Sequence, residues 1–512
     1  MSAVMVPFKR HRVLVLAVLV LLTIGIFSVR PALAQSTGVN AETQFVLNTF
    51  AFLAWGALVM WMCAGFTMLE AGSVRTKNAS MICLKNIGLY SIAGLAFFFI
   101  GYNLMYTDVW HVIGSFEFLY GPSDAEVSLI EGNTGATAEV VGNSYSTMSD
   151  WFFQMVFVAT TASIVSGAIA ERARLWVFFL FILVLTAFIY PVVGAWTWGG
   201  GWLGDRGFQD FAGSTIVHST GGWAALAGVM VIGPRLGKFR RDGSPRPTPP
   251  SNILSVTLGV FILWLGWFGF NGGSQLALGS ALDAVAMSHV LVNTNLAAAA
   301  GVVVALLVSR PILGRMDLFA GLNGAIAGLV SITAGPDIVD HYWAVVIGAV
   351  GGAICVGAIR LMEMVKLDDV VGAIPAHLFA GVWGTLAVCI AAGGQFHIQL
   401  LGVVSIGAFV FGVSYLLEED RRSQGGALGG TPWAGHRRAG DRSVPRICVD
   451  ARAGRRGQLA SCCRAAHRDF TGWAATWSGR STFAGCCACR RRPWWTGPSG
   501  RYIRAGSVSM TV

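Results

Sequence analysis

The chain has 512 residues, of which 54% are hydrophobic and only 12% are charged. Soluble globular proteins carry about 25% charged residues, so this composition excludes a disordered protein and disfavours a soluble enzyme. Glycine supplies 65 residues, close to twice its usual share of about 7%. Because small residues let transmembrane helices pack closely, the composition predicts an all-α polytopic membrane protein.

The net charge of +10 is concentrated at one end of the chain. Residues 421–512 contain 17 Arg and 3 Asp but no Lys and no Glu, whereas residues 1–420 hold more acidic than basic groups. The same C-terminal segment also contains six of the ten cysteines. We therefore interpret the body and the tail of the chain separately.

The N-terminus has the pattern of a secretory signal peptide. Basic residues at 9–12 precede an apolar run from 13 to 29, and Ala-Leu-Ala at 32–34 is typical of a cleavage site. We therefore predict a signal peptide over residues 1–34, with an uncleaved first helix as the alternative. A secretory signal without organelle features indicates a bacterial inner membrane.

Between residues 35 and 420, apolar stretches long enough to span about 30 Å of hydrocarbon recur eleven times. The predicted spans are 46–69, 84–107, 151–170, 175–196, 212–232, 252–271, 286–308, 317–334, 342–362, 371–392 and 397–417. An odd number of spans after signal cleavage places the N-terminus outside and the C-terminus in the cytoplasm. The basic residues agree with this topology, since all of them except Arg206 fall on or beside the predicted cytoplasmic side.

Two of the predicted spans begin with the same spacing. Asp210 lies eight residues before His218, and Asp369 lies eight residues before His377. Eight residues of helix rise about 12 Å, so two helices that enter from opposite faces bring both histidines near the bilayer midplane. This pattern predicts two inverted five-helix repeats followed by a final helix.

Each of these residues also has a purely structural interpretation. The aspartates can be helix N-caps, which we consider the main role of Asp369, and a single buried histidine is usually an interhelical hydrogen-bonding partner. Two histidines at matched depth favour a functional interpretation, because ionisable groups inside a bilayer are costly and usually line a pathway.

Aromatic residues accompany the broken, glycine-rich ends of neighbouring spans. Trp198 precedes three glycines, Phe157 lies in the outer part of the third span, and Phe270 ends the sixth. Such residues are ordinarily interfacial belt residues. Grouped around a path, they could hold a cation through ring quadrupoles worth about 0.5–2 kcal/mol each.

With these residues the sequence closely resembles the ammonium transporter (Amt/Mep/Rh) family over roughly residues 40–420. The matching motifs, which occur in order on the predicted topology, are Met-Leu-Glu-Ala-Gly-Ser-Val-Arg-Thr-Lys-Asn at 68–78, Gly-Ala-Ile-Ala-Glu-Arg at 167–172, Asp-Phe-Ala-Gly-Ser at 210–214, Gly-Trp-Phe-Gly-Phe-Asn-Gly-Gly-Ser at 266–274 and Gly-Leu-Asn-Gly at 321–324.

The resemblance implies an outer recruitment site for ammonium. Phe157, Trp198 and Ser274 correspond to this site and would supply cation–π contacts and a hydroxyl acceptor. Asp210 corresponds to the buried acid that supports the site without binding ammonium directly. The substrate implied is ammonium or ammonia, and the process implied is nitrogen uptake.

The resemblance also implies a gate and a pore. Phe157 and Phe270 correspond to the stacked pair that blocks an open water column, and His218 and His377 to the twin histidines that line an apolar pore. A homotrimer with one pore per subunit is implied as well. Neither a cofactor nor a metal ion is implied, and we expect no nucleic-acid partner.

The tail departs from the family pattern after Asp420. Family members usually end in an acidic cytoplasmic segment that mediates regulation by a PII-type protein, and its absence here counts against this partner. The composition of 421–512 indicates an out-of-frame or unrelated disordered segment. A zinc site around Cys486 and Cys489 is the weaker alternative. The arginines of the tail could also rest on anionic membrane lipid, which requires no fold.

Two other functions compete with transport of ammonium. An ammonium sensor would need a folded output domain in the tail, which the composition does not predict. A transporter of another solute would normally show helices broken near the midplane rather than a histidine pair. An enzyme is disfavoured because neither histidine has a nucleophile or a ligand cluster nearby in the sequence.

Overall fold

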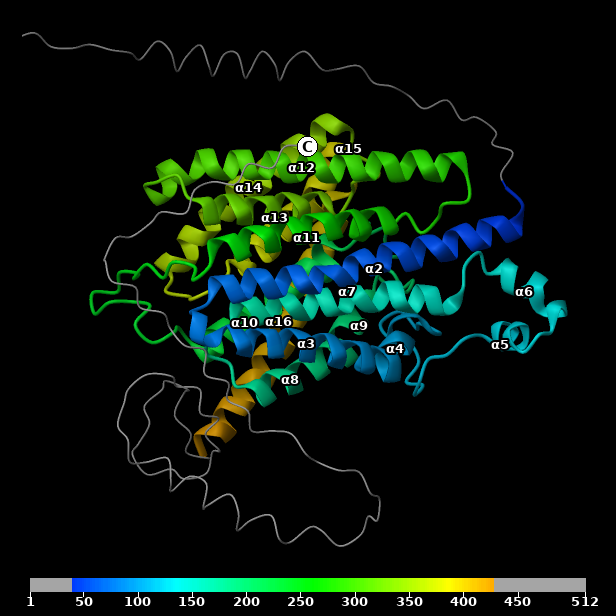
Figure 1. The fold of residues 1–512 in the computed structure, drawn as a ribbon, viewed down its shortest axis with the longest axis horizontal. Helices are drawn as coiled ribbons and strands as arrows, with labels where there is room; N and C mark the ends of the chain where they lie inside the picture. The colour runs from blue at the N-terminus through cyan, green and yellow to red at the C-terminus, as the bar shows by residue number, and fades with distance from the viewer. Residues whose placement is uncertain (1–38, 428–512) are drawn as a thin grey trace, which may run out of the picture. The chain divides into compact units, whose positions relative to one another are not determined.

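The computed structural model describes residues 39–427, which are entirely helical apart from their loops (Figure 1). The α-helices are α2 (Ala41–Ser73), α3 (Ala79–Ala96), α4 (Tyr102–Tyr106), α5 (Asp124–Ile130), α6 (Thr137–Gly142), α7 (Thr147–Ala168), α8 (Leu175–Val184), α9 (Tyr190–Ala195), α10 (Thr220–Ile232), α11 (Ile253–Gly273), α12 (Ala281–Leu313), α13 (Leu318–Ile332), α14 (His341–Met364), α15 (Ala380–Ala392) and α16 (Phe396–Ala427). Four π-helical turns join some of them, η2 (Phe97–Gly101), η4 (Leu185–Ile189), η5 (Ser214–Ser219) and η6 (Ile374–Phe379).

Short polar residues start many of the long helices. A side-chain oxygen of the residue before the helix accepts a hydrogen bond from a backbone N–H of the first turn and so satisfies a donor that has no partner inside the helix. The capping residues are Asn40, Asn252, Ser280, Asp317 and Asp340. A polar capping residue directly before an apolar run therefore explains where each of these helices begins.

Ten helical segments in the described part of the chain are long and apolar enough to cross a membrane. The predicted count of eleven is not confirmed, because the span expected at 317–334 is the 15-residue helix α13. All but three of its residues are buried. A helix enclosed by protein on nearly every side need not match the hydrocarbon thickness on its own.

Four of the predicted spans contain a π turn that the sequence did not reveal. The turns η2 and η4 interrupt the spans expected at 84–107 and 175–196, and η5 and η6 begin the segments that carry the two histidines. Since π turns often mark functional sites, their presence in both histidine segments is informative.

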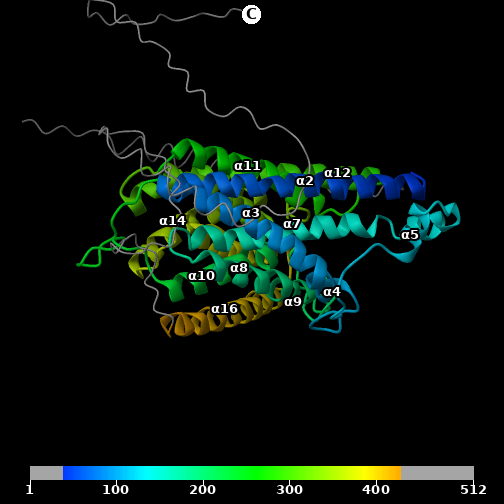
Figure 2. The same cartoon turned by 60° about the horizontal axis from the view of Figure 1, so that its bottom comes forward.

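Helices α2 and α11, which start the two predicted repeats, run antiparallel and lie side by side (Figure 1 and Figure 2). A Cβ at Gly72 would meet Val256, whereas a Cβ at Gly269 would lie 2.7 Å from the carbonyl oxygen of Trp55. Contacts thus pair the end of one helix with the start of the other. The close approach requires glycine and shows why this residue is so abundant.

The histidine segments are also antiparallel. A Cβ at Gly222 would meet the backbone nitrogen of Leu378, at 2.8 Å, and the hydroxyls of Thr215 and Thr385 lie 2.6 Å apart. Equivalent helices of the two halves thus pack in opposite directions, as two inverted repeats require. The final helix α16 then packs beside α10 (Figure 1).

Two predictions fall on the ends of the chain. The signal peptide at 1–34 and nearly all of the tail at 421–512, with its cysteines, lie outside the described residues. Helix α16 continues to Ala427, seven residues beyond the domain boundary predicted at 420. The remaining statements about the two ends stay predictions.

Candidate functional site

Asp210 and Asp369 each cap a segment that opens with a π turn. The two oxygens of Asp210 accept hydrogen bonds from the four backbone N–H groups of residues 213–216, at 2.7–3.1 Å. Asp369 accepts from the N–H groups of residues 372 and 374, at 3.0 and 2.7 Å. The glycine three residues after each aspartate is left-handed, with φ of 104° and 77°, so both halves use one local device to orient a histidine.

The structure brings His218 and His377 into direct contact. Their Nδ1 atoms lie 3.2 Å apart, and their ring centroids are 5.2 Å apart with the planes inclined by 28°. The two side chains are enclosed, since only 0% and 3% of their surfaces are exposed. Nε2 of His218 is buried and has no hydrogen-bond partner, which leaves one polar atom open to a small molecule.

Phe157 and Phe270 form a stacked pair next to these histidines. Their ring centroids are 4.0 Å apart at an angle of 27°, and both rings are buried. The ring of Phe270 lies 5.1 Å from that of His218. The stacked rings therefore close one side of the histidine pair.

Trp198 and Ser274 lie on the far side of the stacked rings. The indole of Trp198 meets Phe157 edge to face, with centroids 6.1 Å apart, and donates through Nε1 to the backbone carbonyl of Asp210 at 3.0 Å. The hydroxyl of Ser274 donates to the carbonyl of Phe270 at 2.8 Å, which orients its own lone pairs toward another donor. Asp210 thus supports the tryptophan while its carboxylate is fully used by backbone N–H groups.

Trp267 is a further site residue to which the sequence analysis assigned no role. Its indole stacks on His218 with centroids 4.7 Å apart and donates to the hydroxyl of Thr333 at 2.8 Å. Trp267 lies three residues before Phe270, so both side chains lie on one face of α11. That spacing within the motif at 266–274 is the signal that could have identified it.

A cavity of about 910 Å³ lies near the start of the segment that carries His377. Its lining includes Asp369, Gly372 and Pro375, which surround the start of η6. Pro375 lies two residues before His377. The structure thus brings Trp198, Phe157, Phe270, His218 and His377 together through successive ring contacts.

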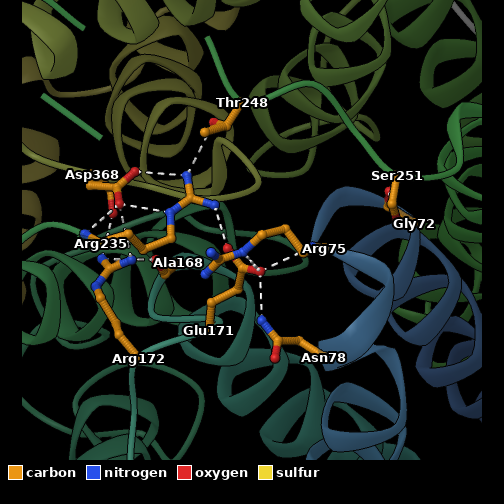
Figure 3. A network of polar contacts seen from close by, with 10 residues as sticks. All are labelled: Gly72, Arg75, Asn78, Ala168, Glu171, Arg172, Arg235, Thr248, Ser251 and Asp368. Carbon is orange, nitrogen blue, oxygen red and sulfur yellow. Dashed lines mark hydrogen bonds and ion pairs between the residues drawn. The ribbon is translucent and has the colours of Figure 1, made fainter. Parts of the chain in front are cut away.

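An ionic network holds the loops beside this cavity (Figure 3). Arg235 donates to Glu171 at 2.9 Å and to both oxygens of Asp368 at 2.8 and 2.9 Å, while Arg75 also pairs with Glu171 at 2.9 Å. Arg172 donates to the backbone carbonyl of Asp368. The sequence analysis quoted Glu171 and Arg172 only as part of a motif, because their partners come from distant loops.

The network changes the acidity of its carboxyl groups. Burial raises the pKa of Glu171, but hydrogen bonds from Arg75, Arg235 and Asn78 outweigh it and hold this pKa at about 2. Arg235 likewise lowers the pKa of Asp368 despite burial. Both acids are therefore charged at neutral pH and bind the loops electrostatically.

Within residues 39–427, no cluster of three or more His, Cys, Asp or Glu side chains could hold a metal ion. The zinc alternative rests on cysteines outside these residues.

The comparisons with known proteins agree with this geometry. The family model described as Ammonium Transporter Family matches residues 50–417. Ammonium transporter Amt2 of Archaeoglobus fulgidus is 42% identical over 397 residues, which cover 75% of this chain and 80% of that protein. The ammonium transporter of Bacillus subtilis is 33% identical over 384 residues, covering 72% and 90% respectively.

Solved structures of the same kind share the fold. A structure described as a Sensor Amt Protein has a TM-score of 0.67 and 36% identity, and the match covers 75% of this chain and 95% of that one. Mep2 of Candida albicans has a TM-score of 0.63 and 27% identity, covering 74% and 85%.

Proposed function

This chain belongs to the ammonium transporter family, and from this premise we propose that it transports ammonium by conducting ammonia along its histidine pair. Its relatives are named as transporters rather than enzymes. The observation that carries the proposal is the buried contact between His218 and His377 directly behind the stacked rings of Phe157 and Phe270.

Selection would begin at the outer aromatic residues. An ammonium ion contacts the rings of Trp198 and Phe157 and donates a hydrogen bond to the hydroxyl of Ser274. Cation–π contacts worth about 0.5–2 kcal/mol each bind the ion weakly enough for it to leave again. Asp210 holds Trp198 in place but does not touch the ion.

Deprotonation would then separate ammonium from potassium. The two ions have the same charge and similar size, but only ammonium can release a proton. Entering the buried region as an ion costs several kcal/mol even after relaxation, and neutral ammonia avoids this cost. Phe157 and Phe270 exclude a continuous water column, so ammonia but no hydrated ion passes them.

The histidines would supply hydrogen bonds inside the pore. One Nδ1 donates to the other, so the two remaining Nε2 atoms comprise one donor and one acceptor. Ammonia can accept from the first and donate to the second. It then reaches the cavity beside η6 and regains a proton on the inner side.

The proposal extends to assembly and location. The family resemblance supports a homotrimer in the bacterial inner membrane that serves nitrogen uptake, with the N-terminus outside and the C-terminus inside. The comparisons do not favour the alternative of an ammonium sensor, because the curated relatives are named ammonium transporters. A PII-type regulatory protein remains a possible partner, but the composition of the tail counts against it.

An ammonium pulse applied to liposomes that contain the full-length protein tests this function. We expect a saturable, inward-positive current with ammonium and none with potassium, both in the full chain and in a version that ends at Ala427. Equal currents with the two ions would contradict selection by deprotonation. Absence of both current and ammonia flux in the two versions would contradict transport of ammonium.

A further inference from the structure

A carboxyl group that the proposed mechanism does not use is buried beside the histidine path. Glu70 of α2 is 0% exposed. Its Oε2 accepts a hydrogen bond from the hydroxyl of Ser166 on α7 at 2.8 Å, whereas its Oε1 is buried and has no protein partner. A buried polar atom without a protein partner usually binds an ordered water molecule.

Lys85 of α3 lies near this carboxyl group without forming a direct ion pair with it. Its ammonium group donates to the backbone carbonyl of Ser166 at 2.9 Å and lies 4.5 Å from the centre of the Phe178 ring. An ammonium group has three donors. An acid and a base are thus both hydrogen-bonded to the same residue of α7, Ser166.

Other buried polar atoms in the same region also lack a hydrogen-bond partner. They are Oδ1 of Asn86, which follows Lys85 on α3, and Nε and Nη1 of Arg172, which follows the end of α7. With Oε1 of Glu70 this makes four such atoms where α2, α3 and α7 meet. A single one would be unexceptional, but four together indicate a hydrated pocket.

Arg172 also belongs to the ionic network of Figure 3, which extends from it to an exposed side chain. Arg172 Nη1 lies 3.6 Å from a carboxylate oxygen of Asp368, which pairs with Arg235. Arg235 also binds Glu171, and Glu171 binds Arg75, whose side chain is 61% exposed. This side of the pocket is therefore bordered by a charged network of arginines and carboxylates rather than by apolar protein.

In the outward direction, hydroxyl groups line one face of α7. Thr160, Ser163 and Ser166 are buried and lie three residues apart, so their side chains are neighbours along the helix. Thr160 is in turn three residues from Phe157, the outer member of the stacked pair. Because a hydroxyl both donates and accepts, such a row, bridged by water, can pass a proton.

We propose that Glu70 carries the proton of each transported ammonium to the inner side, on a route separate from the two histidines. The inference rests on the function proposed above, in which ammonium loses its proton before the stacked rings. Glu70 takes up that proton at Oε1 and becomes a neutral carboxylic acid. It then releases the proton to water on the side of Arg172, and the carboxylate is restored.

The charges balance over the cycle. One ammonium enters, ammonia passes His218 and His377, one proton passes Glu70, and the two recombine as one ammonium inside. The route therefore accounts for a current even though the pore itself conducts a neutral molecule.

The substitution Glu70→Gln separates the two routes. Glutamine keeps the size of the side chain and can still accept from Ser166, but it cannot carry a proton. In liposomes containing the full-length protein, we expect the ammonium current to fall about tenfold or more, as for loss of a proton-transfer group. Ammonia entry, measured as the protein-dependent rise of internal pH, should persist and shows that the variant is folded.

Matched variants test the simpler explanation that Glu70 only neutralises the charge of Lys85. In that case the double variant Glu70→Gln with Lys85→Gln should recover the current, which would overturn the proposal. If Glu70 carries the proton, the double variant should carry as little ammonium current as the single variant. Glu70→Asp, which retains a carboxyl group, should keep part of the current.

Two further outcomes distinguish this inference from the proposed function. A wild-type protein that admits ammonia without current, or a Glu70→Gln variant with undiminished current, would overturn the proton route and leave ammonia conduction intact. A wild-type protein that supports neither current nor ammonia entry would refute the proposed function itself.

Discussion

Nδ1 of His218 lies 3.2 Å from Nδ1 of His377, although 159 residues separate them in the chain. A hydrogen bond at this distance requires one ring to donate and the other to accept. The pair therefore shares a single proton at its centre and presents one donor and one acceptor at its outer nitrogens. Nε2 of His218 has no protein partner, which supports the proposal that the pair binds a molecule that both donates and accepts.

Replacing one ring by an apolar side chain tests this role. His218→Leu preserves much of the volume but removes both nitrogens and leaves Nδ1 of His377 without its partner. We expect ammonium current to fall roughly tenfold or more, because an unmade buried hydrogen bond costs about 1–3 kcal/mol. Current measured in liposomes at equal protein content checks this, and an undiminished current would contradict the role of the pair.

The two aspartate caps are expected to differ in their importance for stability. Asp210→Asn replaces a carboxylate that accepts four backbone N–H groups with an amide that has one acceptor oxygen. We expect a loss of about 1–3 kcal/mol and a lower Tm in detergent. Asp369→Asn is the matched control, and it should cost less because that carboxylate accepts two such bonds. A larger loss at Asp369 would contradict this account.

Trp198 is predicted to affect affinity more than maximal rate. Trp198→Leu removes a cation–π partner worth about 0.5–2 kcal/mol, which corresponds to a rise of about 2- to 30-fold in the half-saturating ammonium concentration. Titration of the current with ammonium measures both quantities. Trp202→Leu is the control, because that indole packs against Arg206 and Trp196 and not against Phe157. Equal effects of the two substitutions would argue against a specific ion site.

The ionic network makes a contribution to stability that depends on pH. The folded-state pKa of Glu171, about 2, lies below its ordinary value of 4.5. Its stabilising effect is therefore complete above about pH 4.5 and is lost as the pH falls through about 2. We expect Glu171→Gln to lower Tm at pH 7 and the difference from wild type to shrink below pH 4.5. A difference that does not vary with pH would indicate a packing defect.

Close packing of α2 on α11 predicts that one glycine cannot be enlarged. A Cβ at Gly259 would lie 2.6 Å from the Leu69 nitrogen and 2.7 Å from the Gly65 oxygen, both backbone atoms that cannot move independently. We expect Gly259→Ala to cost about 1–3 kcal/mol, as overpacking does. Gly357→Ala in α14 is the control, because no atom lies within 4 Å of its Cβ position. Equal Tm values for the two variants would contradict the tight contact.

The sequence alone determined the class of the protein and most of its spans, and it predicted the candidate path residues. Hydropathy and helix length follow from composition along one segment at a time, so the ten long helices could be predicted from local pattern. The repeated spacing from Asp210 to His218 and from Asp369 to His377 predicted two helices of opposite direction, and the resemblance to the ammonium transporter family named Trp198, Phe157 and Phe270.

Only the tertiary structure decided which of these side chains touch. His218 and His377 lie in the π turns η5 and η6, and no local sequence pattern predicts either these turns or the contact between the two rings. Trp267, Glu70 and the partners of Glu171 were missed for the same reason, because their roles depend on contacts between helices and loops far apart in the chain. These contacts are important for stability because they are buried, and polar atoms removed from water must find partners within the protein.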